Sequence, residues 1–187
     1  PRHLLQFAAM GTVYAKKVLG IKNPRVGLLS IGEEAIKGND LTRDAYQLLS
    51  DSRLQFIGNL EARDLYGGDA DVIVCDGFTG NVALKVSKGL VEVVEELLRD
   101  ELNRTFTTQL GFLLSRRSYR RFRRRVDYSE YGGAPLLGVA GLAVVGHGRS
   151  SIKAVRNALA LTYRFVREGI VRSIDENMTL INAERSH

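Results

Sequence analysis

Residues 71–85 read DVIVCDGFTGNVALK, and this stretch predicts a strand, a tight turn and the beginning of a helix. The apolar run Val72–Cys75 is short enough for a buried strand, and the polar turn Asp76–Asn81 follows it directly. Beyond the turn, apolar side chains recur at helical spacing through about Leu98. The stretch therefore predicts one strand–turn–helix unit of an α/β fold.

The preceding chain repeats this alternation of strands and helices. Two more apolar runs, Val26–Ile31 and Leu54–Ile57, predict strands. One predicted helix covers Leu4–Leu19, and a second begins near Asp40, which we expect to cap it. This order predicts a mostly parallel sheet covered by helices on both faces, which is a three-layer α/β/α fold.

A glycine-rich stretch near the end of the chain predicts a fourth strand of the same sheet. Residues 127–151 read DYSEYGGAPLLGVAGLAVVGHGRSS. The run Leu142–Val145 is typical of a buried strand, and Ser150 or Ser151 is placed to cap a helix over Ile152–Glu168. Because the first N–H groups of a helix lack internal partners, this turn is a candidate anion site. A last helix is expected over about Ile170–Ile181.

Composition indicates an ordinary globular protein with one sizeable domain or two small ones. The chain has 187 residues, of which 44% are apolar and 26% charged. It shows no apolar run of membrane-spanning length and no secretory signal, so we expect a cytoplasmic protein. Its single cysteine, Cys75, cannot form an intramolecular disulfide and is expected to pack in the core. Because the chain begins with Pro1 and not Met, we expect it to be a fragment.

The net charge of +6 comes from one basic cluster within a predicted helical excursion over residues 82–126. The cluster contains seven arginines: Arg116, Arg117, Arg120, Arg121, Arg123, Arg124 and Arg125. The apolar residues Phe112, Leu113 and Leu114 precede it, which is typical of an interfacial element. The cluster suits nucleic acid, an anionic membrane or an acidic protein partner. A solvated excursion that packs on its own partner helix remains the alternative.

Polar side chains follow three of the four predicted strands. Loops after parallel strands emerge at one edge of a sheet, where such folds bind ligands. The residues in these loops are Lys37 and Asn39 after the first strand, Asp76, Thr79 and Asn81 after the third, and His147, Arg149, Ser150 and Ser151 after the fourth. This set suits a phosphate group and a polarised carbonyl. The sequence shows no metal-ligand spacing, no nucleophile elbow and no dinucleotide fingerprint.

Four stretches in the same order closely resemble the bacterial phosphate acyltransferases, which convert acyl-acyl carrier protein and inorganic phosphate to acyl phosphate and free carrier protein. The stretches are LLQFAAMGTVYAKKVLG (4–20), VGLLSIGEEAIKGN (26–39), DVIVCDGFTGNVALK (71–85) and DYSEYGGAPLLGVAGLAVVGHG (127–148). The resemblance implies a fold similar to phosphotransacetylases and isopropylmalate dehydrogenases, and a homodimer at the start of phospholipid synthesis. It also implies that residues 1–187 are the C-terminal part of a longer enzyme.

The resemblance assigns expected roles to individual residues. Lys37 is expected to neutralise phosphate or the oxyanion, and Asn81 to donate a hydrogen bond to the reacting carbonyl. Further candidates for binding phosphate or substrate are Asn39, Asp76, Thr79, His147 and Ser150. The expected contacts with membrane or carrier protein are Phe112, Leu113, Leu114, Arg116, Arg117, Arg120 and Arg121. Direct attack of phosphate on a thioester needs no metal or redox cofactor.

Two other functions fit parts of the sequence. A phosphotransacetylase-type enzyme acting on a coenzyme A thioester would share the fold and the chemistry. A nucleic-acid-binding protein would use the arginine cluster, but outside that cluster the chain has no excess of positive charge and no recognisable nucleic-acid module. Nucleic acid is therefore not an expected partner.

Overall fold

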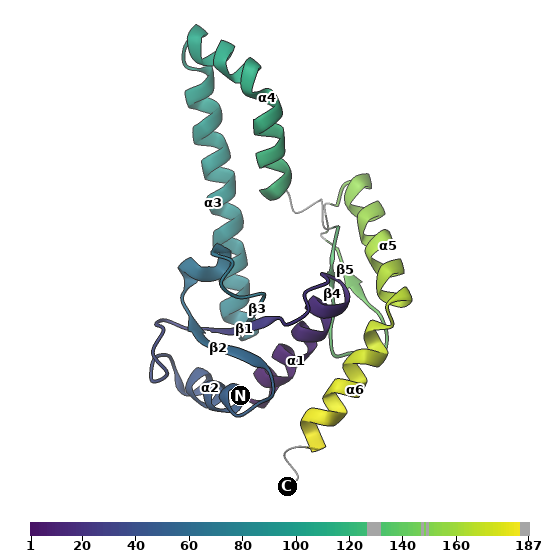
Figure 1. The fold of residues 1–187 in the computed structure, drawn as a ribbon. Coiled ribbons are helices and arrows are strands. Elements are labelled where there is room, and N and C mark those ends of the chain that lie inside the picture. Colours follow the sequence, from purple (N-terminus) through teal and green to yellow (C-terminus); the bar gives the residue numbers. More distant parts are fainter. Residues whose placement is uncertain (127–131, 147, 149, 184–187) are drawn as a thin grey trace.

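A computed structural model describes residues 1–126, 132–146, 148 and 150–183. Helices and strands alternate through the first half, and helices dominate the second (Figure 1). The elements are α1 (Arg2–Lys17), β1 (Arg25–Leu29), α2 (Asp40–Ser50), β2 (Gln55–Leu60), the 3-10 helix η1 (Ala62–Tyr66), β3 (Val72–Val74), α3 (Gly77–Asn103), α4 (Phe106–Val126), β4 (Ala134–Pro135), β5 (Val144–Val145), α5 (Ile152–Arg167) and α6 (Ile170–Ala183). The predicted α/β class and the first three strands are confirmed.

The main sheet has three parallel strands in the order β2-β1-β3. Arg25 lies at the beginning of β1 and forms three hydrogen bonds with Asp71, which lies just before β3. Its backbone N–H donates to the Asp71 carboxylate at 2.8 Å, and its Nε and Nη2 donate at 3.0 and 3.1 Å. This fork holds two neighbouring strands together at their amino ends, so their carboxyl ends also lie side by side.

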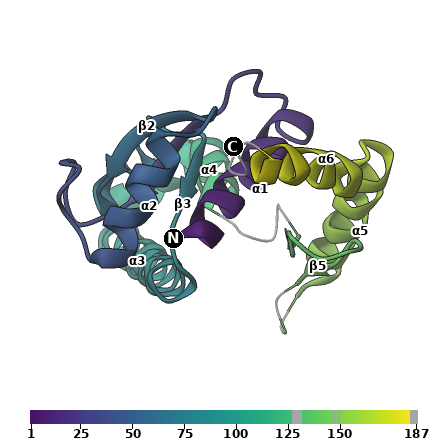
Figure 2. The ribbon, with the colours of Figure 1, turned by 90° about the horizontal axis from the view of Figure 1, so that it is seen from below.

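Helices α1 and α2 cover one face of this sheet. The core contains Leu4, Leu5 and Ala8 of α1, Val26 and Leu28 of β1, Ala45 and Leu49 of α2, and Val74 of β3. The apolar residues of α1 recur every three or four positions, which explains why that helix is buried along one side. α6 packs along α1 on the side away from α2 (Figure 2). The prediction that a third layer covers the opposite face stays a prediction.

The prediction that Asp40 caps α2 is wrong. Asn39 is the capping residue, because its backbone is extended and its side-chain oxygen accepts a hydrogen bond from the Thr42 backbone N–H at 3.0 Å. Asp40 lies in the first helical turn, where its carboxylate pairs with Arg43. At α5, Ser151 is the cap, with its hydroxyl oxygen 3.2 Å from the Ala154 nitrogen.

The prediction of a fourth parallel strand is also wrong. Val144 and Val145 form β5, which pairs antiparallel with β4 in a separate two-stranded sheet. The Leu136 backbone N–H donates to the Ala143 carbonyl at 2.8 Å, so the chain turns back on itself locally. At Gly132 the backbone passes so close to α5 that a Cβ would lie 2.3 Å from the Ala158 nitrogen. A short apolar run cannot by itself distinguish such a hairpin from a strand of the main sheet.

Helices α3 and α4 form a long antiparallel hairpin that projects away from the sheet (Figure 1). Phe112 and Tyr119 of α4 meet edge to face with ring centroids 5.2 Å apart. The packing of α3 against α4 gives the predicted excursion its own partner helix. Many apolar side chains of the hairpin remain exposed, including Leu97 of α3 and Leu114 of α4. Within the described residues, no helix is both long and apolar enough to cross a membrane.

Candidate active site at the carboxyl edge of the sheet

The loops after β1 and β3 emerge at the same edge because these strands are parallel neighbours. The first loop carries Lys37 and Asn39, and the second carries Asp76, Thr79 and Asn81. Two of the three predicted loops therefore emerge at one edge of the sheet, as expected. Each also leads into a helix N-terminus, where unpaired N–H groups favour an anion.

The loop that carries Lys37 is held by contacts to the neighbouring chain. The Asn59 side-chain nitrogen, at the end of β2, donates to the Glu34 carbonyl at 2.9 Å. The Lys37 backbone N–H donates to the same carbonyl at 3.0 Å and closes a turn. Glu33, the residue before Glu34, forms a salt bridge with Arg63 of η1, in which Nη2 and Oε1 lie 2.9 Å apart. The backbone is fixed in this way while the Lys37 side chain stays exposed.

Gly38 follows Lys37 and allows the chain to turn into α2. Its φ of +103° lies in a region that side chains disfavour, and a Cβ there would lie 2.1 Å from the Thr42 hydroxyl. Asn39 then uses its side-chain oxygen to cap α2. The predicted phosphate-binding residue Asn39 thus has a structural role that sequence alone did not assign to it.

The turn after β3 is organised by Asp76. Its carboxylate accepts hydrogen bonds from the backbone N–H groups of Phe78 and Thr79, both at 2.9 Å, and from the Thr79 hydroxyl at 2.5 Å. The Thr79 hydroxyl and these N–H groups hold the pKa of Asp76 below its ordinary value. Asp76 therefore caps α3 as an anion. Asn81 lies in the early turns of α3 with its side chain exposed.

The loop predicted to complete the site follows β5 and so does not extend from the main sheet. His147 and Arg149 lie outside the described residues. Ser150 is described and partly buried, next to the capping residue Ser151. Convergence of this third loop on Lys37 and Asn81 therefore stays a prediction.

Cys75 ends the run that contains β3 and is partly buried. Burial is the main cause that raises the pKa of its thiol, and the neighbouring charge of Asp76 adds to it. A raised pKa keeps the sulfur protonated and weakly nucleophilic. The described residues contain no group of His, Cys, Asp and Glu side chains arranged to hold a metal ion.

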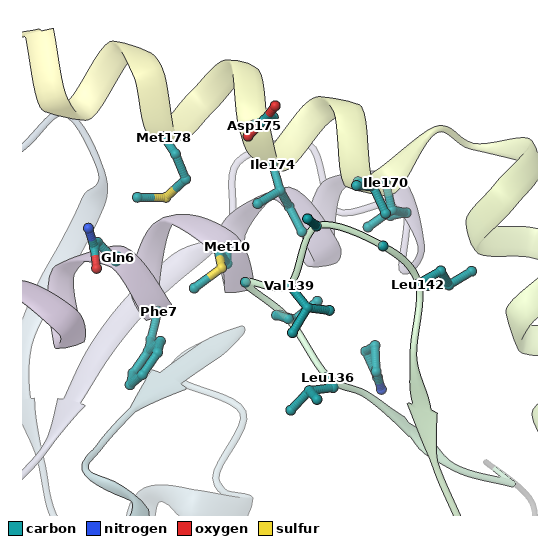
Figure 3. Close-up of a pocket in the computed structure, with 16 residues that line it drawn as sticks. Gln6, Phe7, Met10, Leu136, Val139, Leu142, Ile170, Ile174, Asp175 and Met178 are labelled. Carbon is teal, nitrogen blue, oxygen red and sulfur yellow. The ribbon is translucent and has the colours of Figure 1, made fainter.

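A pocket of about 570 Å³ lies beside α1, on the flank that faces α6. Its walls come from α1, from the loop between β4 and β5, and from α6 (Figure 3). Figure 3 shows Gln6 and Phe7 at one end and Leu142 and Ile170 at the other. Residues 135–142 of the glycine-rich stretch thus line a pocket whose side chains are mostly apolar. The predicted anion site, the turn that leads into α5, is not part of this lining and stays a prediction.

Sequence reasoning missed Asn59, Arg63 and this pocket. A polar residue at position 59 interrupts the apolar end of β2, and this interruption was the available signal for Asn59. Arg63 lies in a loop rich in charges, where no single residue stands out. The pocket depends on the hairpin of β4 and β5, which the sequence pattern did not reveal.

The family model that matches this chain and the similar curated proteins agree with each other. Residues 1–173 match the family described as fatty acid synthesis protein. A phosphate acyltransferase of Geotalea uraniireducens is 49% identical over 178 residues, which is 95% of this chain and 51% of that protein. One of Acidobacterium capsulatum is 53% identical over 173 residues, which is 92% of this chain and 51% of that protein. The chain thus spans about half the length of these curated relatives, and it belongs to the fatty acid synthesis protein family.

Proposed function

We propose that this chain is the C-terminal half of an enzyme that transfers an acyl group from acyl-acyl carrier protein to inorganic phosphate. The carrying observation is the pairing of β1 with β3, which places the Lys37 loop and the N-terminus of α3 at one edge of the sheet. The relatives named phosphate acyltransferase support this reaction class. The sequence resemblance supports the carrier protein as acyl donor.

The reaction needs a nucleophile, an electrophile and a means to stabilise charge. A phosphate oxygen attacks the thioester carbonyl carbon, forming a C–O bond and a tetrahedral oxyanion. Collapse of this oxyanion breaks the C–S bond, and the electron pair leaves with the sulfur as a thiolate. Ordinary thiols have a pKa of about 8.5, so the thiolate is a good leaving group. The enzyme's task is to orient phosphate and stabilise the oxyanion.

Lys37 and Asn81 are the proposed catalytic residues. The ammonium group of Lys37 neutralises phosphate or the oxyanion, and its supporting loop is fixed by the Asn59 and Arg63 contacts. The Asn81 amide donates to the reacting carbonyl. One donor of this kind contributes about 3 to 4 kcal/mol in other enzymes. The residues proposed to shape the phosphate pocket are Asn39, Asp76, Thr79, His147 and Ser150.

The accessible surface supports function within a larger assembly. It measures 13,096 Å², whereas a compact monomer of 20.7 kDa exposes about 8,900 Å². Stable obligate interfaces bury about 2,000 to 5,000 Å² over both partners, or about 1,000 to 2,500 Å² on each, so the excess on this chain is more than one such interface covers. We propose that the other half of the full-length protein and a second subunit of a homodimer cover this surface.

Helix α4 is the proposed contact for an anionic membrane surface or for the acidic carrier protein. Leu113 and Leu114 are 61% and 80% exposed, and Arg116, Arg117 and Arg121 are exposed nearby. Phe112 is instead half-buried on the side of α4 that faces Leu98 and Leu102 of α3, so it is less available for such a contact. Each basic residue near an anionic membrane contributes about 1 kcal/mol, so the cluster supports reversible binding. Arg120 belongs to the same basic cluster in the sequence.

The test is an assay on a joined protein, in which this chain follows the unmatched half of the Acidobacterium capsulatum relative. Acyl phosphate is trapped with hydroxylamine after incubation with phosphate and a thioester. We expect product from acyl-acyl carrier protein and much less from the matching coenzyme A thioester. Product from coenzyme A thioesters alone would instead identify a phosphotransacetylase-type enzyme, and no product from either would reject acyl transfer.

A further inference from the structure

The pocket beside α1 has the lining of a site for a neutral apolar ligand. Its side chains come from Met10 of α1, Val139 of the β4–β5 loop, and Ile174 and Met178 of α6, among others. Its volume of about 570 Å³ falls within the range of about 300 to 1,000 Å³ that small-molecule sites show. Methionine side chains adapt to flexible apolar ligands because they are unbranched and polarisable.

The side chains that line the pocket do not favour an anionic ligand. Its lining contains no lysine, arginine or histidine, and its single ionisable side chain is the carboxylate of Asp175. A phosphate in this place would find no compensating cation, and burial of an unpaired charge is costly. The pocket is therefore chemically distinct from the phosphate site at the sheet edge.

The position of the pocket connects it with that edge. Gly11 of α1 lies against Val72 at the beginning of β3, since a Cβ there would be 2.6 Å from a Val72 methyl carbon. A short loop over residues 18–24 joins the end of α1 to the beginning of β1, which is parallel to β3. Helix α1 thus runs antiparallel to β3. The Phe7 end of the pocket consequently lies toward the strand end that leads to Asp76 and Asn81.

We propose that this pocket binds the alkyl part of the acyl donor, a neutral chain attached to the thioester. The identity of the ligand rests on the proposed function, since acyl transfer supplies the alkyl chain. The geometry assigns the thioester to the sheet edge and the methylene groups to the space between α1, the β4–β5 loop and α6. Residues 135–142, which line the pocket, then determine acyl-chain fit.

The first test measures binding by the 187-residue chain without turnover. The probe is a fluorescent C18 fatty acid methyl ester, which is neutral, and the competitors are S-acyl-N-acetylcysteamine thioesters with 8, 10 and 12 carbons. We expect one saturable site and about fourfold tighter competition for each added methylene, which corresponds to about 0.8 kcal/mol. Binding that does not saturate, or that does not strengthen with chain length, would overturn the proposal.

Variants locate the site. Val139→Trp and Ile174→Trp fill the pocket from two different elements, and each is expected to weaken probe binding at least tenfold. The matched control is Val166→Trp, because Val166 of α5 is 67% exposed and does not line the pocket. Circular dichroism shows whether the variants are folded. If all three are folded and bind the probe equally tightly, the assignment is wrong.

Photo-crosslinking gives a readout that requires no variant. A neutral S-acyl-N-acetylcysteamine thioester with a diazirine on its alkyl chain is expected to modify peptides from α1, residues 135–142 and α6, and labelling confined to α3 and α4 would overturn the proposal. The same labelling is repeated on the joined protein. If the chain alone binds the probe and the joined protein does not, other parts of the protein fill the pocket and the proposal is wrong. Because these experiments measure binding alone, they can succeed even where acyl phosphate formation fails.

Discussion

The Asn59 side-chain nitrogen lies 2.9 Å from the Glu34 carbonyl oxygen and joins the end of β2 to the loop that carries Lys37. Asn59 is 5% exposed, whereas Glu34 is exposed, so this hydrogen bond ties a surface loop to a buried side chain. Its side-chain oxygen has no hydrogen-bond partner within the described part of the chain. A buried, half-satisfied amide is costly, which indicates that its bond to the loop is the reason for its presence.

Asn59→Ala removes this tie between β2 and the Lys37 loop. Loss of a buried side chain and its hydrogen bond is expected to lower the free energy of unfolding by about 1 to 3 kcal/mol. Urea denaturation followed by circular dichroism measures the change. The control is Asn177→Ala, whose amide also donates to a backbone carbonyl but is exposed, and which should stay within about 0.5 kcal/mol of wild type. Equal effects of both variants would contradict the role of Asn59.

Gly38→Ala introduces a side chain where φ is +103° and the Thr42 hydroxyl lies in the way. We expect a loss of about 1 to 3 kcal/mol of stability, because a non-glycine residue is strained in this region. Gly89→Ala is the matched control, since a Cβ there meets no described atom within 4 Å and Gly89 lies in the middle of α3. The control should stabilise by about 0.5 to 1 kcal/mol. A thermal melt in which Gly38→Ala matches wild type would disprove strain at this turn.

Asp76 makes the stability of α3 depend on pH. Its folded-state pKa is lowered from the ordinary value of 3.8 by the Thr79 hydroxyl and the helix N–H groups. The stabilisation is therefore complete above the unfolded-state pKa and is lost as pH falls through the lower, folded-state pKa. Asp76→Ala should cost about 1 kcal/mol at pH 7, and the difference from wild type should shrink below about pH 4. Denaturant titrations across pH 2.5–7 measure it.

The control for this pH dependence is Ser151→Ala at α5. The Ser151 hydroxyl caps α5 without carrying a charge, so its loss should cost about 1 kcal/mol at every pH in the range. A wild-type advantage over Asp76→Ala that stays constant down to pH 2.5 would show that the Asp76 charge plays no part.

Helix α4 should bind anionic vesicles in a way that depends on both its apolar and its basic residues. Flotation with vesicles of phosphatidylglycerol and phosphatidylcholine is expected to recover the wild-type chain at low salt and less of it as salt rises. Leu113→Asp should reduce recovery, as should reversal of Arg116 and Arg117 to Glu. Val166→Asp on α5 changes an equally exposed apolar residue and should not. Undiminished flotation of the α4 variants would reject membrane contact by this helix.

The first half of the fold could be predicted because its signals are local. Each strand of the main sheet is a short apolar run ended by a polar or glycine-rich turn, and α1 shows clear helical periodicity. The choice between Asn39 and Asp40 as cap could not be made in advance, since both residue types cap helices well. It depends on which residue keeps an extended backbone, and the turn at Gly38 determines this.

The second half depends on long-range contacts that sequence pattern does not contain. Val144 and Val145 look like a parallel strand, but their partners are Ala134 and Pro135 in a local hairpin. The loop of the same hairpin, residues 135–142, forms one wall of the pocket beside Met10, which the sequence pattern did not reveal. At the candidate site, the loops that carry Lys37 and Asn81 could be found from their position after strands, and the family resemblance singled out these two residues. Asn59 required knowledge of which carbonyl lies opposite it.

The most direct test of the central claim is steady-state kinetics of Lys37→Ala and Asn81→Ala in the joined protein. The substrates are acyl-acyl carrier protein and phosphate, and Lys22→Ala and Asn177→Ala serve as controls on exposed residues of the same types. If Lys37 and Asn81 stabilise the oxyanion, each variant should lower kcat/KM about 100-fold or more while the controls stay near wild type. Near-normal turnover in both Lys37→Ala and Asn81→Ala would contradict the proposed site.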